Sequence, residues 1–216
     1  MTAYAPNTPR LAKVAIVIFE RNAPSPSVVT FQYNPETLTR DLKANAMEGG
    51  AASEAFRLNG APTETLKLEC FFDATDDLEA NETTARAHGV RHKLAALEML
   101  LYPSVKTVRT NAALLQLGTI EILPMQGPFT VLVLGSRVLP FRLSGLSIAE
   151  EFFDENLNPI RAKVSLDLTV LTYSDLERSH PGYSIYLGHQ AVQETLAGLG
   201  RKSVPASILS QKLGAV

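Results

Sequence analysis

The sequence predicts a mainly antiparallel β-sandwich or β-barrel with one α-helix packed against it. The first observation is the order of segments, which runs from strands to a single helix and back to strands. The second is the stretch 162–170, in which apolar and polar residues alternate without a break. A period of two places the apolar side chains on one face of a strand, against a core, and the polar side chains on the other face.

Residues 11–19 and 27–33 predict the first two strands. The stretch 11–19 is almost entirely apolar and rich in Val and Ile, which is typical of a strand covered on both faces. The polar segment 36–62 that follows is too long for an ordinary hairpin turn and carries glycines near its middle. We expect either an arm or two strands joined by a flexible tip.

Residues 63–72 predict a further strand, and residues 87–101 predict the one clear helix. The strand alternates, with four apolar residues on one side, namely Leu66, Leu68, Cys70 and Phe72. The helix has an apolar stripe at spacings of three and four, formed by Ala87, Val90, Leu94, Leu97 and Leu101. Pro103 ends the helix.

After a linker, the second half of the chain predicts strands at 119–123, 129–134 and 137–143, followed by a hairpin between 146 and 173. Turn-forming residues separate the two hairpin strands, namely Asp154, Asn156, Asn158 and Pro159. From residue 174 the composition changes to Ser, His, Gly and Gln. We therefore expect a main domain over 1–173 and an appendage over 174–216, with a short helix or an extended tail.

Composition narrows the classes of function. The apolar share of 45% and the charged share of 19% suit a folded protein, and a net charge of −2 argues against nucleic acid as the main partner. No apolar run approaches the ~20 residues needed to cross a bilayer. The first residues lack the features of a signal peptide. Cys70 is the only cysteine, so no intrachain disulfide can form, which fits a reducing cytoplasm.

Two patterns are reminiscent of metal sites and are better explained otherwise. His88 and His92 are four residues apart, but Gly89 stands where a zinc-protease motif needs glutamate, so surface histidines are favoured. The segment 154–158 resembles the opening of a calcium loop. That loop requires glycine at its sixth position and glutamate at its twelfth, where this chain has Pro159 and Ser165. A hairpin turn explains the same residues, and we expect no metal site.

The sequence gives no stronger indication of catalytic groups than of metal sites. Asp73, Asp76 and Asp77 precede a helix, where acidic residues are common without a catalytic role. Cys70 falls on the apolar side of its strand, which favours a buried, inert thiol. The sequence contains no nucleophile elbow, phosphate-binding loop or dinucleotide fingerprint. We expect a protein that is not an enzyme and holds no cofactor.

Four segments together resemble one family. They are 29–36, with Phe31, Asn34 and Pro35; 66–77, with Phe72 and Asp73; 129–143, with Gly135; and 152–172, with Asp154, Pro159, Arg161 and Ala162. The last is similar to a hairpin motif of the form Phe-x-x-Asp-x-x-Gly-x-Pro-x-Arg-Ala. In this order they resemble the N-terminal domain of the tube-like adaptor proteins of contractile injection systems, the phage-tail-like machines of bacteria. The resemblance covers 11–173.

Two departures accompany the resemblance. The turn at 134–136 reads Leu-Gly-Ser where the family tends to have tryptophan, so packing beside that turn is expected to differ. Related adaptors often carry a LysM module after this domain, and nothing after Ser174 resembles one.

The resemblance implies a tail-tube-like fold and a structural role. The chain would form a homo-oligomeric ring, of six copies, that joins the inner tube to the spike and baseplate of a phage-tail-like particle assembled in the cytoplasm. An inner tube subunit or tube terminator of the same machine is the alternative, and a ligand-binding β-sandwich is a more distant one. Neither nucleic acid nor a membrane span is expected.

Two surfaces are candidates for assembly contacts. The polar face of the second hairpin strand would face the lumen of the ring or a neighbouring copy, and it carries Lys163, Ser165, Asp167 and Thr169. The segment 36–62 is the natural arm for reaching a neighbour. Deleting residues 44–53 is expected to abolish ring or tube stacking and to leave a folded monomer, whereas intact particles would contradict this role.

Overall fold

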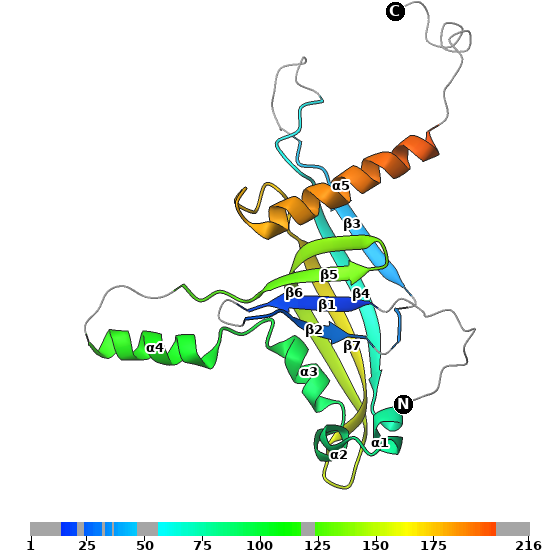
Figure 1. Ribbon diagram of the computed structural model, residues 1–216, viewed down its shortest axis with the longest axis vertical. Coiled ribbons are helices and arrows are strands. Elements are labelled where there is room, and N and C mark those ends of the chain that lie inside the picture. Colours follow the sequence, from blue (N-terminus) through cyan, green and yellow to red (C-terminus); the bar gives the residue numbers. More distant parts are fainter. Residues whose placement is uncertain are drawn as a thin grey trace, which may run out of the picture.

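The computed structural model describes residues 14–20, 24–31, 33–35, 37–46, 56–117 and 124–201. In this part of the chain one antiparallel sheet is flanked by helices (Figure 1). The strands are β1 (Ala15–Phe19), β2 (Ser27–Thr30), β3 (Leu38–Lys43), β4 (Thr63–Asp73), β5 (Phe129–Leu134), β6 (Arg137–Phe153) and β7 (Pro159–Val170). The helices are α1 (Thr75–Glu79), α2 (Thr83–His88), α3 (Arg91–Glu98), α4 (Val105–Gln116) and α5 (Pro181–Gly200).

The mainly antiparallel fold class is confirmed. The seven strands of the described ranges lie in the order β2-β1-β5-β6-β7-β4-β3, and every neighbouring pair is antiparallel. The sheet is not a closed barrel, because β2 and β3 each pair with one strand only among these residues. The predicted strand at 119–123 and the middle of the predicted arm, 47–55, lie outside the described residues.

Alternation along β4 and β7 builds the core as predicted. The apolar residues of β7 are at most 2% exposed, namely Ala162, Val164, Leu166, Leu168 and Val170. In β4 the side chains of Leu66, Leu68, Cys70 and Phe72 are equally buried. The two strands pair directly, with Leu66 opposite Leu168 and Leu68 opposite Leu166. Cross-strand apolar pairs on one covered face therefore stabilise the centre of the sheet.

The long strand β6 replaces two predicted strands, because 137–143 and 146–153 are continuous. A register shift lies between them: Leu143 pairs with Leu168 and Gly145 with Asp167, so Ser144 has no opposite residue. This β-bulge changes which residues face the core. Odd-numbered residues such as Phe141 and Leu143 are buried before it, and even-numbered Leu146 and Ile148 pack on the core after it.

The edge strand β3 comes from the first part of the predicted arm. It pairs with β4, and among the described residues the rest of the arm contributes an isolated bridge between Ala46 and Leu58. Arg40 of β3 forms a 2.6 Å ion pair with Glu64 of β4, whose side chain is 4% exposed. Since a buried carboxylate needs a partner, this pair holds the edge strand to the sheet.

The single predicted helix over 87–101 is wrong in detail. Helices α2 and α3 are separate, and Gly89 between them adopts a φ of 54°. A Cβ atom on Gly89 would lie 2.1 Å from the carbonyl oxygen of Pro159, so only glycine allows this close approach to β7. The apolar stripe itself is correct in part, since Val90, Leu94 and Leu97 are buried in the core.

The C-terminal helix α5 is longer than the short helix expected within 174–216, and it packs beside the sheet (Figure 1). Tyr186 is 6% exposed and belongs to the core, with its ring 5.8 Å from that of Tyr173. Near the start of α5, His180 stacks edge-on against Phe129 at 4.6 Å. Among the helices of the described residues, none is both long and apolar enough to span a membrane.

Candidate assembly surface

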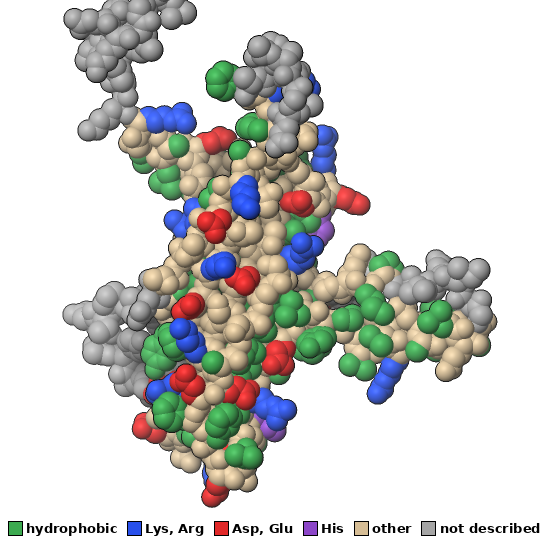
Figure 2. Space-filling model, turned by 180° about the vertical axis from the view of Figure 1, so that it is seen from behind, with side chains coloured by type: hydrophobic (Ala, Val, Ile, Leu, Met, Phe, Trp, Pro, Cys, Tyr) green, Lys and Arg blue, Asp and Glu red, His purple; other side chains and the backbone are tan. Residues whose placement is uncertain are grey.

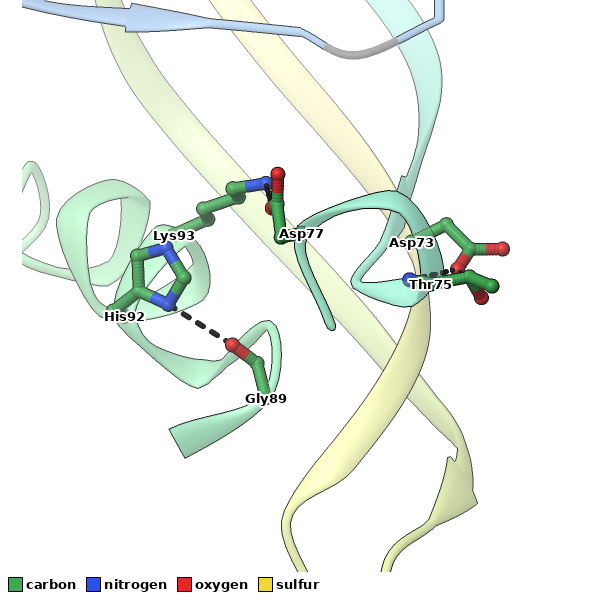
Figure 3. A network of polar contacts seen from close by, with 6 residues as sticks. All are labelled: Asp73, Thr75, Asp77, Gly89, His92 and Lys93. Carbon is green, nitrogen blue, oxygen red and sulfur yellow. Dashed lines mark hydrogen bonds and ion pairs between the residues drawn. The ribbon is translucent and has the colours of Figure 1, made fainter. Parts of the chain in front are cut away.

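Family-motif residues meet where β4 ends and β7 begins. Asp73 accepts hydrogen bonds from the Thr75 amide at 2.8 Å and from the Thr75 hydroxyl (Figure 3). Its Oδ2 atom also accepts from the Arg161 guanidinium, at 2.7 and 3.0 Å. Burial raises the pKa of Asp73, but these hydrogen bonds outweigh it and hold the pKa below its usual range. The pair therefore ties two neighbouring strands to the start of α1.

A second set of contacts fastens the small helices to the same end of the sheet. Lys93 of α3 forms a 2.7 Å ion pair with Asp77 of α1, and His92 contacts the Gly89 carbonyl oxygen at 3.0 Å (Figure 3). The Val90 amide donates to the Pro159 carbonyl oxygen at 2.8 Å. This places Pro159 beside the α2–α3 junction, where it acts as a structural residue.

The turn between β6 and β7 is organised by Asp154. Its Oδ1 atom accepts from the amides of Asn156 and Asn158, both at 2.8 Å, and its Oδ2 accepts from the Asn158 side chain at 2.9 Å. These hydrogen bonds lower the pKa of Asp154. The three hydrogen bonds that Asp154 accepts all come from within the turn, which supports the hairpin explanation over a calcium loop.

The hairpin tip, defined as residues 150–158, exposes large apolar side chains. Phe152, Phe153 and Leu157 are 65%, 50% and 79% exposed. Phe152 and Leu157 also have positive φ angles, of 54° and 61°, which are strained for residues with a side chain. Arg161 lies over the Phe152 ring at 5.3 Å. Leu157 occupies the position at which the resembled motif has glycine, and its φ explains why glycine suits that place.

The polar face of β7 lies beside the polar face of β4. Lys163 pairs with Glu69 at 3.0 Å and lies 5.7 Å from the centre of the Phe71 ring. Asp167 stands opposite Lys67, with a charge separation of 3.9 Å. Ser165 and Thr169 are half-buried in the same row. The four candidate residues therefore share one surface, and whether it faces a lumen or a neighbour stays a prediction.

The remaining family-motif residues occupy structural positions. Phe31 and Ala162 are fully buried, and the Phe31 ring lies 5.8 Å from that of Phe72. Asn34 accepts a hydrogen bond from the Val14 amide at 3.2 Å, next to half-buried Pro35. Gly135 adopts a φ of 58° in the turn that joins β5 to β6.

Helix α4 was missed by the sequence prediction, which treated this stretch as a linker. It extends away from the sheet (Figure 1) and exposes an apolar stripe, with Val105 60%, Val108 43% and Leu115 58% exposed. Ser104 caps the helix by accepting from the Thr107 amide at 3.2 Å. A capping serine followed by apolar residues at spacings of three and four was the available signal.

The described ranges hold no group of three His, Cys, Asp or Glu side chains placed to bind a metal ion. His88 is exposed, and the His92 ring contacts the Gly89 carbonyl oxygen. Cys70 is buried, and burial raises its pKa to about 12, so its thiol stays protonated and unreactive. The cysteine is thus part of the core, as its strand position indicates.

Open sheet edges and exposed apolar side chains are surfaces on which another chain can pair. The contractile injection system tube protein family matches residues 10–178, which is most of the chain. The chain therefore belongs to the contractile injection system tube protein family, and the predicted family resemblance is confirmed. The class that this family defines is a structural component of a contractile injection system.

One solved structure that resembles the chain is the cryo-electron microscopy structure of the anti-feeding prophage baseplate, 6-fold symmetrised. The two chains share 16% sequence identity, with 76% of this chain and 93% of that chain covered and a TM-score of 0.24. No curated protein sequence matches the chain.

Proposed function

We propose that the chain forms a ring that joins the inner tube of a contractile injection system to its spike and baseplate. The ring contains six copies and is assembled in the cytoplasm as part of a phage-tail-like particle. The observation that carries this proposal is the open sheet, which ends in β2 on one side and β3 on the other within the described residues. An edge strand presents backbone groups that pair with another chain.

The two sheet edges are formed by different strands, β2 and β3, which favours a head-to-tail arrangement of copies. When β2 of one copy lies beside β3 of the next, every copy uses both edges, and a closed ring leaves none unpaired. The backbone shows which groups of β2 are available. The Phe31 amide donates to the Val14 carbonyl oxygen at 3.0 Å, so by alternation Val29 directs its N–H toward β1 and Val28 directs its N–H outward.

Helix α5 supports an adaptor role over that of a repeating tube subunit. The family match ends at residue 178, and α5 begins at Pro181. The helix exposes apolar side chains beyond the family region, including Leu187, Val192, Leu196 and Leu199. An additional surface of this kind suits a protein that contacts a different partner above or below the tube.

A proline pair tests the edge contact. Val28→Pro removes an outward N–H and is expected to abolish ring formation with little loss of folding, whereas Val29→Pro removes an N–H directed at β1 and is expected to destabilise the sheet. Rings are scored by electron microscopy and mass photometry, and folding by thermal unfolding. Rings that persist in the folded Val28→Pro variant would contradict the edge contact.

Mixing with preformed inner tubes separates the adaptor from the tube subunit. An adaptor adds as a single ring at one end of the tube and stops further growth there. A tube subunit incorporates along the length or polymerises by itself into tubes. Gold-labelled protein in electron micrographs distinguishes these outcomes, and a chain that stays monomeric under all conditions would overturn the proposed function.

A further inference from the structure

Helix α4 has one covered face and one exposed face. Thr107, Asn111 and Leu114 are buried or half-buried on one side. The other side carries the exposed stripe, formed by Val105, Val108, Ala112 and Leu115. These residues recur at spacings of three and four, so they align along the helix. An apolar stripe on a helix that projects from the body (Figure 1) is a surface for another chain.

The charge of α4 has a single sign. Lys106 and Arg109 are its only charged residues, and the helix contains no acidic residue. Arg109 is four residues from Val105 and lies at the border of the stripe. The exposed face therefore combines apolar and positive groups, and it is suited to a partner that combines apolar and negative groups.

The hairpin tip has this complementary character. Residues 150–158 include four acidic residues and no basic residue, namely Glu150, Glu151, Asp154 and Glu155. They surround the exposed side chains of Phe152, Phe153 and Leu157. Beside Phe152 lies a small hollow lined by Thr75, Ile160 and Arg161. At the lower end of the molecule acidic and hydrophobic side chains lie together with some basic ones (Figure 2), among them Arg161 beside Phe152.

The tip is also held rigidly in an unfavourable conformation. Asp154 fixes the turn through hydrogen bonds from its neighbours, and Phe152 and Leu157 keep positive φ angles. A bulky residue with positive φ persists only where its surroundings impose it, and such strain is concentrated at functional positions. A rigid apolar projection loses little conformational entropy when it binds.

We propose that the apolar stripe of α4 in one copy docks on the hairpin tip of a second copy of the chain. Within one copy α4 and the tip point in different directions (Figure 1), so the two surfaces are left for different molecules. The contact uses two different surfaces and is therefore heterologous, as a ring or stack of rings requires. The inference rests on the proposed ring and identifies a contact beyond the sheet edges.

The other exposed helix face is a weaker match for α4. Helix α5 exposes Leu187, Val192, Leu196 and Leu199, but Glu194 is its only acidic residue. Charge complementarity selects between partners more strongly than apolar area does, because unpaired like charges oppose a wrong contact. The tip is therefore the partner to which the proposal commits.

Charge reversal in the full chain tests the contact. One variant carries Lys106→Glu and Arg109→Glu on α4, and a second carries Glu150→Lys and Glu155→Lys on the tip; Asp154 is left intact because it holds the turn. Each variant alone is expected to self-associate about tenfold more weakly in sedimentation velocity at low salt. Thermal unfolding confirms that both are folded.

Mixing the two variants provides the decisive measurement. The reversed helix then meets the reversed tip, and the unchanged helix of the second variant meets the unchanged tip of the first. Equal amounts are expected to recover association close to that of the wild-type chain. Arg178→Glu is the matched control, with no expected effect. Glu194→Lys tests the competing surface on α5, and weakening by that variant alone would overturn the proposal.

The outcomes separate this inference from the proposed function. Rings that form normally in both reversed variants overturn the α4–tip contact and leave the ring role intact. Association that is lost in each variant and recovered in the mixture, without closed rings in the wild type, supports the contact and contradicts the ring. A wild-type chain that fails to self-associate overturns both.

Discussion

Leu157 adopts a backbone conformation that is unfavourable for a residue with a side chain. With a φ of 61°, it lies in the left-handed region that costs an ordinary residue about 1–2 kcal/mol. Its side chain is 79% exposed, so packing within the monomer does not compensate for this cost. The turn imposes this conformation, and the exposed side chain is available for the proposed contact with a second copy.

Replacing Leu157 by glycine is expected to separate stability from assembly. The Leu157→Gly variant should unfold with a free energy about 0.5–1 kcal/mol higher, since relief of the left-handed strain exceeds the greater entropy of glycine in the unfolded chain. It should also self-associate more weakly. Leu157→Ala is the control, because it loses the contact and keeps the strain. Equal stability of the two variants in urea titrations would contradict this account.

His189 is expected to make stability depend on pH. Burial lowers its pKa below the usual 6.5; the charge of Glu64 opposes this shift, and those of Arg40 and Arg137 add to it. His189 therefore takes up a proton more readily in the unfolded chain than in the folded one. As pH drops below about 6.5, protonation of His189 should favour the unfolded chain and lower the free energy of unfolding. His189→Gln should flatten the dependence between pH 7.5 and 5.5, and exposed His88→Gln should leave it unchanged.

At the scale of elements, the strands were predictable and the helices much less so. The period of two in 162–170 is a local signal, and the same residues are buried in β7. Helices α2 and α3 are separated at Gly89, where the backbone approaches the carbonyl oxygen of Pro159. Pro159 is far away in the sequence, so the helical spacing of apolar residues does not reveal this contact. The candidate site was predictable only in its polar face and turn, because α4 carries no motif beyond its cap and stripe.

Gly89 allows a tertiary contact that joins the helices to the sheet. Gly89→Ala should lower the free energy of unfolding by roughly 2–4 kcal/mol, because the new Cβ meets the Pro159 backbone and the φ is positive. Gly188→Ala in α5 meets nothing within 4 Å and should raise stability by about 0.5–1 kcal/mol. Chemical denaturation compares the two alanine variants, and similar effects of both would contradict the role of Gly89.

At the scale of the whole molecule, α5 connects a region beyond the family match to the core. Tyr186 is buried among core residues, and Gly182 packs closely against Phe129 and Leu176. The composition of 174–216 predicted an appendage. Composition alone does not reveal that Tyr186 is buried in the core of the sheet domain.

Ending the chain after Arg178 tests this arrangement. The shortened protein should remain folded and lose unfolding free energy, of which about 2–3 kcal/mol comes from the burial of the Tyr186 side chain. Tyr186→Ala in the full chain should reproduce most of that loss in calorimetry. A shortened chain without cooperative unfolding would contradict the prediction that 1–173 is the main domain.

Strand β6 has the form of a regular strand with one residue inserted. Leu143 and Gly145 face consecutive residues of β7, so removing Ser144 alone would leave an unbroken ladder with Leu146 and Ile148 still directed at the core. Removing Ser147 instead would turn every later side chain of the strand to the opposite face. The strand therefore has one position at which its length can change by a single residue, and we expect length variation among descendants of this sequence to be confined there.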